Sequence, residues 1–363
     1  MRKIHRKLRR APRDMSLAFH ESRFEVGAPD HGARLDGFLS RHLRWRSRTS
    51  IQRAIGEGRI EVRSFKDPQR ATVAGMRSGL RLRRGQEVVV RLDAPRVQVG
   101  DQLPGWCESR CVVIFEDHQI LAVAKPPHLS VYPSRRHRGV SLIELVHARH
   151  RELFGAPRYA PALCHRLDRE TTGLVLFAKS RDARSQLGLQ FETRGVEKTY
   201  LALVMGEVEG DRGEVSLPLG PAQDSVVEIK SGPRQPPVGR TSRTLWRVRR
   251  RLRDRTLLEL SPVTGRHHQL RAHMKALGHP IVGDKLYLGG DDLFLRSLAG
   301  ALTRQDERRL GLGHQALHAW CLEFAHPEDG RHQRLEAPLW ADVAASVSAA
   351  ETDDVAPACR DSA

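Results

Sequence analysis

The sequence has no long apolar run and no paired cysteines. No hydrophobic stretch approaches the roughly 18 residues that a membrane helix needs. The basic start of the chain is not followed by the apolar core that a signal peptide requires. The cysteines form neither CxxC pairs nor an even disulfide set: Cys107, Cys111, Cys164, Cys321 and Cys359. These absences predict a soluble protein of the reducing cytoplasm with no membrane partner.

Acidic residues are too few to balance the basic ones. The 363 residues include 61 Lys and Arg against 43 Asp and Glu, which gives a formal charge of +18. Most of the basic residues are arginines, whose planar guanidinium binds phosphate through two hydrogen bonds and stacks on bases. A GC-rich genome would also favour arginine over lysine, but that bias alone creates no net positive charge. We therefore predict a polyanionic partner, RNA before any other.

Changes in composition divide the chain into five segments. The first is basic and then polar, as expected of a flexible arm, and Met15 is an alternative start to Met1. The last is small, polar and acidic, as expected of a disordered tail. The predicted order is arm, small module, linker, larger domain and tail: residues 1–32, 33–93, 94–110, 111–341 and 342–363.

The small module carries helical and then strand-like periodicity. The stretch ARLDGFLSRHL places Leu35, Phe38, Leu39 and Leu43 on one helical face. A second helix is expected after Ser47, a residue type that caps helix N-termini well. The stretches GRIEV and GQEVVVRL then alternate as strands do. The module should therefore be a compact helix-helix-strand unit.

This pattern resembles the RNA-binding module named after ribosomal protein S-four. RLDGFL, SR..IQ..I..GRI.V and a late G..V.V carry the resemblance, whereas RSFKDPQRATVAGMRSG replaces the short turn common in that family. The resemblance implies RNA contact through the second helix and its flanking arginines: Arg44, Arg46, Arg48, Arg53 and Arg59. The alternative is that these arginines form an ordinary solvated helix face.

In the larger domain, strands and helices intermix without a regular βαβ repeat. Strands are expected in VVIFE, ILAVAKP, GLVLFAK, KTYLALVMGEV, SVVEIK, TLWRV and RTLLELSPV. Helices are expected in SLIELVHARHREL, SRDARSQLGLQFETR and near HHQLRAHMKALG. We therefore predict an α+β fold, in which a mixed and largely antiparallel sheet domain follows a small α+β module.

The densest chemical signal is HRLDRETTGLVLFAK at residues 165–179, a charged loop followed by an apolar strand. Arg166 and Arg169 flank Asp168, and neighbouring cations lower a carboxyl pKa, so Asp168 should stay ionised. An ionised aspartate can act as a nucleophile. The alternative is that these residues form an ordinary surface ion-pair cluster with Glu170.

The same string resembles the signature of RluA-type RNA pseudouridine synthases, with Thr172 where serine is more usual. Three further stretches agree with that family in order: ILAVAKPPHLSVYPS, EKTYLALV and PVTGRHHQLRAHMKALGHPIVGDKLY. The likeness covers about residues 111–341. It implies a pseudouridine synthase domain, an isomerase that converts uridine in RNA to pseudouridine without a cofactor.

Position by position, the resemblance implies roles for four residues. Asp168 would be the catalytic carboxylate, Tyr200 would handle a proton, and Arg271 would be the basic partner of Asp168. Because a stacked uracil is out of reach of an enzyme, the target base must be flipped into a pocket. Arg166 would then help to occupy the place of the flipped base.

Other basic residues near these motifs are further candidates. Arg266 could contact RNA, and the ammonium of Lys125, which precedes two prolines, could meet a phosphate. A lysine that is merely exposed to solvent is an equally good interpretation of Lys125. His268 and His273 do not follow the HExxH spacing, so no metal site is predicted.

Within the family, the combination of these two domains is most often associated with large-subunit ribosomal RNA of the 23S type, so that RNA is the expected substrate. Transfer RNA is the nearest alternative. A noncatalytic RNA-binding or ribosome-assembly factor is the alternative from another class, and the intact set of Asp168, Tyr200 and Arg271 argues against it. No obligatory protein partner is evident.

Overall fold

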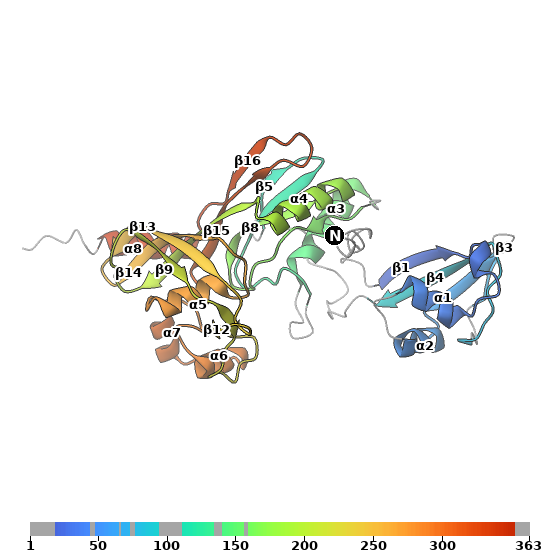
Figure 1. Cartoon of the computed structure of the whole chain (residues 1–363), viewed down its shortest axis with the longest axis horizontal. Coiled ribbons are helices and arrows are strands. Elements are labelled where there is room, and N and C mark those ends of the chain that lie inside the picture. The colour runs from blue at the N-terminus through green and yellow to red at the C-terminus, as the bar shows by residue number, and fades with distance from the viewer. Residues whose placement is uncertain are drawn as a thin grey trace, which may run out of the picture. The chain divides into compact units, whose positions relative to one another are not determined.

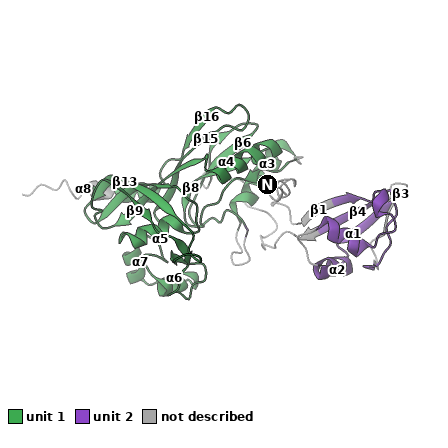
Figure 2. Cartoon of the chain, in the orientation of Figure 1, with its two compact units in different colours: residues 1–12, 102–132, 140–363 green, residues 13–101, 133–139 purple. Residues whose placement is uncertain are grey.

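The computed structural model describes residues 19–43, 48–64, 67–72, 77–93, 111–133, 140–155 and 159–352. The chain divides into two compact units, coloured separately in Figure 2. Residues 13–101 and 133–139 belong to the N-terminal unit, and residues 1–12, 102–132 and 140–363 belong to the C-terminal unit.

The N-terminal unit is a four-stranded antiparallel sheet, in the order β1-β4-β2-β3, with two short helices. Its elements in chain order are β1 Phe19–Glu25, the 3-10 helix Ala28–Asp30, α1 Leu35–His42, α2 Arg48–Gly56, β2 Ile60–Ser64, β3 Asp67–Thr72 and β4 Gln86–Asp93. The four apolar residues predicted to share a helical face are each at most 1% exposed and enter one core with α2 and the sheet. The expected helix-helix-strand order is confirmed.

The expectation of a flexible arm up to residue 32 is wrong over residues 19–32. Residues 19–25 form β1, which pairs along its length with β4, and Val26 is fully buried. The partner strand lies some seventy positions later in the chain, so no local sequence pattern predicts the pairing. Residues 1–18, the predicted linker at 94–110 and the predicted cap Ser47 lie outside the described residues.

The C-terminal unit is built on a ten-stranded sheet in the order β10-β13-β14-β9-β15-β8-β6-β5, with β16 beside β15 and β7 beside β8 (Figure 1). The strands are β5 Val112–Glu116, β6 Ile120–Lys125, β7 Ala162–Leu163, β8 Thr172–Ala178, β9 Glu197–Met205, β10 Arg212–Ser216, β13 Arg243–Leu252, β14 Arg255–Pro262, β15 Leu317–Ala325 and β16 His332–Glu336. Only the β15 to β8 pairing is parallel among the pairs of this sheet. The predicted α+β fold with a largely antiparallel sheet is confirmed.

Helices cover the sheet, and a small hairpin of β11 and β12 lies outside it. These elements are β11 Leu219–Pro221, β12 Ser231–Pro233, α3 Leu142–Phe154, α4 Arg181–Thr193, α5 Gln269–Ala276, α6 Asp291–Leu298, α7 Arg304–Leu310 and α8 Ala341–Thr352. Helix α4 packs on β8, α5 contacts β12 and β14, and α8 contacts β13. Within the described part of the chain, no helix has the length and apolar character needed to cross a bilayer.

One expected strand is wrong. Residues 225–230 form a loop, and β12 begins only at Ser231. Asp291, at the start of α6, accepts hydrogen bonds from the Ser225 hydroxyl at 2.6 Å and from the Val226 backbone N–H at 2.9 Å. Val226 is therefore held with 79% of its surface exposed, although its sequence context suggests a buried strand.

The expectation of a disordered tail from residue 342 is wrong as far as residue 352. Helix α8 buries Val343 and Val347 against the core formed by β9, β13, β14 and α5. The His314 ring lies 2.9 Å from a carboxylate oxygen of Asp342 in the same helix. Two valines among small polar residues are too little signal to predict a packed helix from sequence. Residues 353–363 lie outside the described residues.

The packing of α8 predicts that Val343→Ala lowers the free energy of unfolding by about 2 kcal/mol, because buried methyl groups are lost and a cavity remains. Urea denaturation followed by circular dichroism measures this difference. Ser348→Ala, at an exposed position of the same helix, is the matched control and should unfold as the wild type does. Equal stability of the two variants would contradict a packed α8.

Candidate active site

The loop that carries Asp168 enters strand β8 through a tight turn. The backbone N–H of Thr171 donates to the carbonyl of Asp168 at 3.2 Å, and the Thr171 hydroxyl accepts a hydrogen bond from Gln315. Gly173 then has φ +104°, and a Cβ there would collide with the backbone of Ala319 on β15. This glycine lets β8 and β15 approach in parallel, which fixes the point from which the loop projects.

Asp168 is held by a buried arginine that is itself held by a second aspartate. Arg271, on α5, donates from Nη1 to Oδ2 of Asp168 at 2.9 Å. It donates from Nε and Nη2 to the two carboxylate oxygens of Asp284, at 2.6 and 2.9 Å. Oδ1 of Asp284 also accepts the backbone N–H groups of residues 286 and 287, each at 3.0 Å. The guanidinium therefore has a fixed orientation and presents one N–H edge to Asp168.

These contacts keep Asp168 ionised. Burial would raise the pKa of Asp168, but the charge of Arg271 and its hydrogen bond outweigh burial and leave the pKa below its usual value. Burial likewise opposes the charge of Arg271, yet Asp284 and Asp168 together raise the arginine pKa. The result is a carboxylate charged at neutral pH with 26% of its side chain exposed to the pocket.

Tyr200, on β9, lines the same pocket as Asp168. Burial, with the negative charge of Asp168 adding to it, raises the pKa of Tyr200, so the phenol is protonated at neutral pH. The pocket has a volume of about 460 Å³, within the range of small-ligand sites. A partly buried carboxylate beside a protonated phenol is an arrangement suited to acid–base or nucleophilic chemistry.

Basic side chains gather at the same pocket. Arg166, Lys198 and Arg266 contribute to its lining. Arg166 is exposed, whereas Arg266 donates from Nε to the carbonyl of Thr241 at 3.1 Å. Such a cationic rim around a partly buried carboxylate would attract a polyanion to the pocket.

Two histidines complete the wall next to Asp168. The rings of His267 and His268 stack with centroids 3.9 Å apart, and Nε2 of His268 lies 3.6 Å from Oδ2 of Asp168. Together with Asp168 they bring possible metal-ligand atoms within 4.8 Å of one another. Arg271 already donates to the same Asp168 oxygen, and its charge would repel a second cation. We therefore assign no metal to this group.

Both interpretations of Lys125, a contact with RNA phosphate and a lysine merely exposed to solvent, are wrong. Lys125 is fully buried, and its ammonium donates to the carbonyls of Pro126, Leu129 and Arg169 at 2.7 to 3.0 Å. Burial lowers the pKa of Lys125 to about 7. Its contacts join the segment after β6 to the residue that follows Asp168, so this lysine supports the loop from inside. Carbonyl groups of the turn after β6 and of the loop that carries Asp168 therefore hold its ammonium inside the protein.

The alternative of a simple surface ion-pair cluster also differs from the structure. Glu170 pairs with Lys285, whose Nζ lies 2.8 and 2.9 Å from its two carboxylate oxygens. Asp168 instead pairs with Arg271, more than a hundred positions away. The two carboxylates of the HRLDRE string therefore have separate partners.

The arginines predicted for RNA contact in the N-terminal unit have different surroundings. Arg48 and Arg59 each form an ion pair within the unit. Arg53 is exposed on α2. Arg44 and Arg46 lie outside the described residues.

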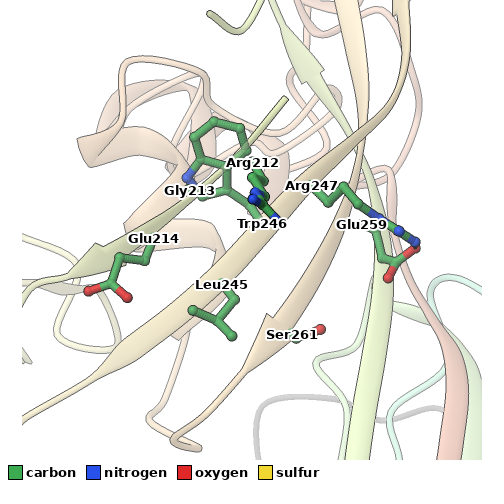
Figure 3. A pocket seen from close by; sticks show the side chains of 8 residues that line it. All are labelled: Arg212, Gly213, Glu214, Leu245, Trp246, Arg247, Glu259 and Ser261. Atoms are coloured by element: carbon green, nitrogen blue, oxygen red, sulfur yellow. The ribbon is translucent and has the colours of Figure 1, made fainter. Parts of the chain in front are cut away.

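A second hollow lies on β10, β13 and β14, where Figure 3 shows the side chains that line it. Three of its charged lining residues are paired: Arg247 contacts Glu259 at 2.9 Å, and Glu214 contacts Arg243 at 2.6 Å. Charges that neutralise one another on an open sheet face do not have the perturbed, convergent geometry of the Asp168 pocket. The Asp168 pocket is therefore the better candidate for chemistry.

Sequence reasoning missed three residues at the site: Asp284, which fixes Arg271, Tyr287, whose ring lies against the Arg271 guanidinium, and the pocket-lining Lys198. Asp284 and Tyr287 lie in the stretch GDKLY, and Lys198 lies two positions before Tyr200 on the same strand. The period of two in a strand places residues 198 and 200 on one face, so Lys198 could have been found. The role of Asp284 depends on a tertiary contact that no spacing shows.

Comparisons with known proteins agree with this geometry. The chain matches the family model described as RNA pseudouridylate synthase over residues 119–276. The ribosomal large subunit pseudouridine synthase D of Nitrosomonas europaea is 33% identical over 334 residues, covering 91% of this chain and 88% of that protein. The ribosomal large subunit pseudouridine synthase C of Escherichia coli K12 is 34% identical over 324 residues, covering 86% and 92%. Human RNA pseudouridylate synthase domain containing 4 has a TM-score of 0.54 at 25% identity, covering 66% of this chain and 92% of that one.

The buried Arg271 to Asp284 pair predicts a pH-dependent loss of stability in Asp284→Asn. The substitution removes the carboxylate that binds the buried guanidinium through two hydrogen bonds and leaves Arg271 only its single contact to Asp168, so we expect a loss of about 3–5 kcal/mol at neutral pH. Burial would raise the pKa of Asp284, but Arg271 and two backbone N–H groups lower it overall. Its stabilising contribution is therefore present above the unfolded carboxyl pKa of about 4 and is lost as the pH falls through the lower folded value.

Urea unfolding of wild type and Asp284→Asn from pH 7 down to pH 3.5 measures this dependence. The difference in stability between them should narrow at the acid end. Asp292→Asn is the matched control, because Asp292 pairs with Arg296 at an almost fully exposed position and should not alter stability. A constant difference across the pH range would contradict the lowered pKa of Asp284.

Proposed function

Because this chain belongs to the RNA pseudouridylate synthase family, as an isomerase of the RluA type, we propose that Asp168 is its catalytic carboxylate. The single observation that carries the proposal is the Arg271 contact, which keeps a partly buried carboxylate ionised and aimed into the pocket. The reaction breaks the bond between N1 of uracil and C1′ of the ribose, turns the ring, and joins C5 to C1′. An ionised carboxylate can assist the cleavage at the ribose, and C5 then loses its proton.

Tyr200 is proposed to handle that proton. A protonated phenol can relay a proton, because its oxygen accepts one proton while the hydroxyl donates its own. The raised pKa of Tyr200 supports this role, since the hydroxyl keeps its proton in the resting site. Arg271 orients Asp168 and stabilises its charge.

The basic rim of the pocket is proposed to hold the RNA around the extruded uridine. Arg166 is exposed at the mouth of the pocket, where its guanidinium can stack in the gap that the flipped base leaves. Arg266, which also lines the pocket, can contact a phosphate. Phosphate contacts of this kind supply affinity, while the carboxylate supplies chemistry.

The N-terminal unit is proposed to be an S-four-like RNA-binding module covering residues 33–93, joined through a linker at 94–110 to a catalytic domain at 111–341. Among the arginines expected to face RNA, α2 carries Arg48 and Arg53, and Arg53 is exposed. Strand β1 extends the folded part of this unit before residue 33. Such a module adds phosphate contacts without adding sequence information of its own.

The proposed substrate is large-subunit ribosomal RNA of the 23S type. The curated relatives from Nitrosomonas europaea and Escherichia coli are both named as ribosomal large subunit pseudouridine synthases. They align over most of their length. Transfer RNA is the substrate that the experiment must distinguish. A ribosomal substrate would place the reaction in the cytoplasm, where ribosomes are assembled.

We predict that Asp168→Asn abolishes isomerisation, with a loss of at least about 1000-fold, while RNA affinity is retained. The amide keeps the shape of the carboxylate but can neither attack nor remain negatively charged. Tritium release from 5-tritiated uridine measures the reaction on unmodified large-subunit ribosomal RNA and on transfer RNA. Carbodiimide mapping then locates the uridine that has changed.

Release from ribosomal RNA by the wild type alone would support both the synthase role and the substrate. Tritium release from transfer RNA alone would make transfer RNA the proposed substrate. Normal turnover by Asp168→Asn would remove Asp168 from the chemistry. RNA binding by both proteins, measured by filter retention, separates a lost reaction from lost affinity.

We also predict that Arg53→Glu weakens RNA binding and flattens its salt dependence, because each phosphate contact releases a counterion. The slope of log affinity against log salt should fall by roughly one contact, about 0.7 to 0.9. Arg63→Met is the matched control, since Glu61 already pairs with that guanidinium. Removal of residues 1–93 should weaken binding further and leave turnover on saturating RNA less affected. Unchanged affinity in both variants would exclude the N-terminal unit from RNA binding.

A further inference from the structure

The protonation of His268 follows from the hydrogen bonds of Tyr287. The Tyr287 hydroxyl donates its one hydrogen to the carbonyl oxygen of Ser231 at 2.8 Å and accepts the Ser231 backbone N–H at 3.0 Å. Nδ1 of His268 lies 3.1 Å from the same hydroxyl oxygen. Because that hydrogen is already used, Nδ1 must be the donor, and a neutral imidazole then has its lone pair on Nε2.

The ring of His268 is uncharged at neutral pH. Burial lowers the pKa of His268 to about 3, and the cation of Arg271 adds to this effect. Nε2 is therefore a hydrogen-bond acceptor that faces Oδ2 of Asp168 at 3.6 Å. Two acceptors at this separation have no hydrogen between them, so the wall of the pocket offers a place for a donor from outside the protein.

The substrate has one hydroxyl that can fill this place. Inside an RNA chain the O3′ and O5′ atoms are esterified to phosphate, so the 2′-hydroxyl is the only hydroxyl donor of the ribose. It lies on the carbon next to C1′, where the glycosidic bond breaks. A carboxylate that addresses C1′ therefore brings the 2′-hydroxyl close to the acceptor beside it.

We propose that Nε2 of His268 accepts a hydrogen bond from the 2′-hydroxyl of the target ribose and thereby selects RNA over DNA at that nucleotide. The proposal rests on the proposed role of Asp168, because that role brings the ribose to this wall. Ser231 and Tyr287 act as positioning residues, since they set the tautomer of His268. The uracil N3–H is the competing donor, and the experiment distinguishes the two.

The test compares two amide substitutions that imitate different halves of the imidazole. Asn places an N–H donor near the position of Nδ1 and has nothing at Nε2, so His268→Asn keeps the Tyr287 contact and loses the acceptor. Gln reaches the position of Nε2 with its carbonyl oxygen, so His268→Gln keeps an acceptor there. The full-length variants act on a short synthetic RNA hairpin that carries the mapped uridine with either ribose or 2′-deoxyribose.

The measured quantity is the ratio of kcat/KM for the ribose substrate to that for the deoxyribose substrate, from nuclease digestion and chromatography of the product. Loss of the 2′-hydroxyl also changes the glycosidic bond itself, so the comparison between proteins is decisive. In His268→Asn the ratio should fall about 10-fold below that of the wild type. In His268→Gln it should stay within about threefold of the wild type.

An unchanged ratio in His268→Asn would overturn the proposal. Equal loss of the ratio in both variants would also overturn it, because the effect would then come from disturbed packing. A hairpin with 3-methyluridine at the target completes the test. If His268→Asn lowered the kcat/KM ratio of uridine to 3-methyluridine and left the ratio of ribose to deoxyribose unchanged, N3–H would be the donor. Wild type that fails to convert the ribose hairpin would instead count against the proposed function.

Discussion

The site depends on one buried guanidinium shared between two carboxylates. Arg271 is 8% exposed and would be strongly destabilising there without compensation. Asp284 binds it through two hydrogen bonds and is fixed in turn by backbone N–H groups of the segment that follows it. Only one N–H edge of the guanidinium is left for Asp168. The arrangement therefore fixes both the charge and the direction of the carboxylate that faces the pocket.

The sheet brings this group together from separate parts of the chain. Asp168 precedes β8, Tyr200 lies on β9, and Arg271 lies on α5, which contacts β14. Because β9 and β8 both pair with β15, the loop before β8 and the side chain of Tyr200 reach the same pocket. Lys125, which is buried at the end of β6, stabilises this loop by donating a hydrogen bond to the carbonyl of Arg169. The long central strands thus act as the rigid support that a precise site requires.

Sequence patterns were most informative where the structure depends on local period. The face containing Phe38 and Leu39 is buried as its helical spacing indicates, and the strand after the HRLD string is buried along its whole length. Patterns failed where a distant partner decides the outcome. Strand β1 depends on β4, the loop at residues 225–230 depends on Asp291, and the inward turn of Lys125 depends on carbonyl groups of two loops. Asp168 could be selected by its motif, but its ion pair with Arg271 could be expected only through the family resemblance, and Asp284 was not foreseen.

The charged groups that would attract RNA are different from those that hold the reacting carboxylate. Asp168, Arg271 and Asp284 together carry one net negative charge, and the positive charge that would attract RNA lies apart from them on Arg166, Lys198 and Arg266. Tyr200 and His268 stay neutral, because burial opposes their charged forms. A neutral lining adds no negative charge that would repel the Asp168 carboxylate and no acid that would protonate it. It also leaves hydrogen bonds, rather than ion pairs, to recognise the ribose and base. Recognition of the reacting nucleotide can therefore be sensitive to one hydroxyl group, while the surrounding phosphates supply binding that does not depend on sequence.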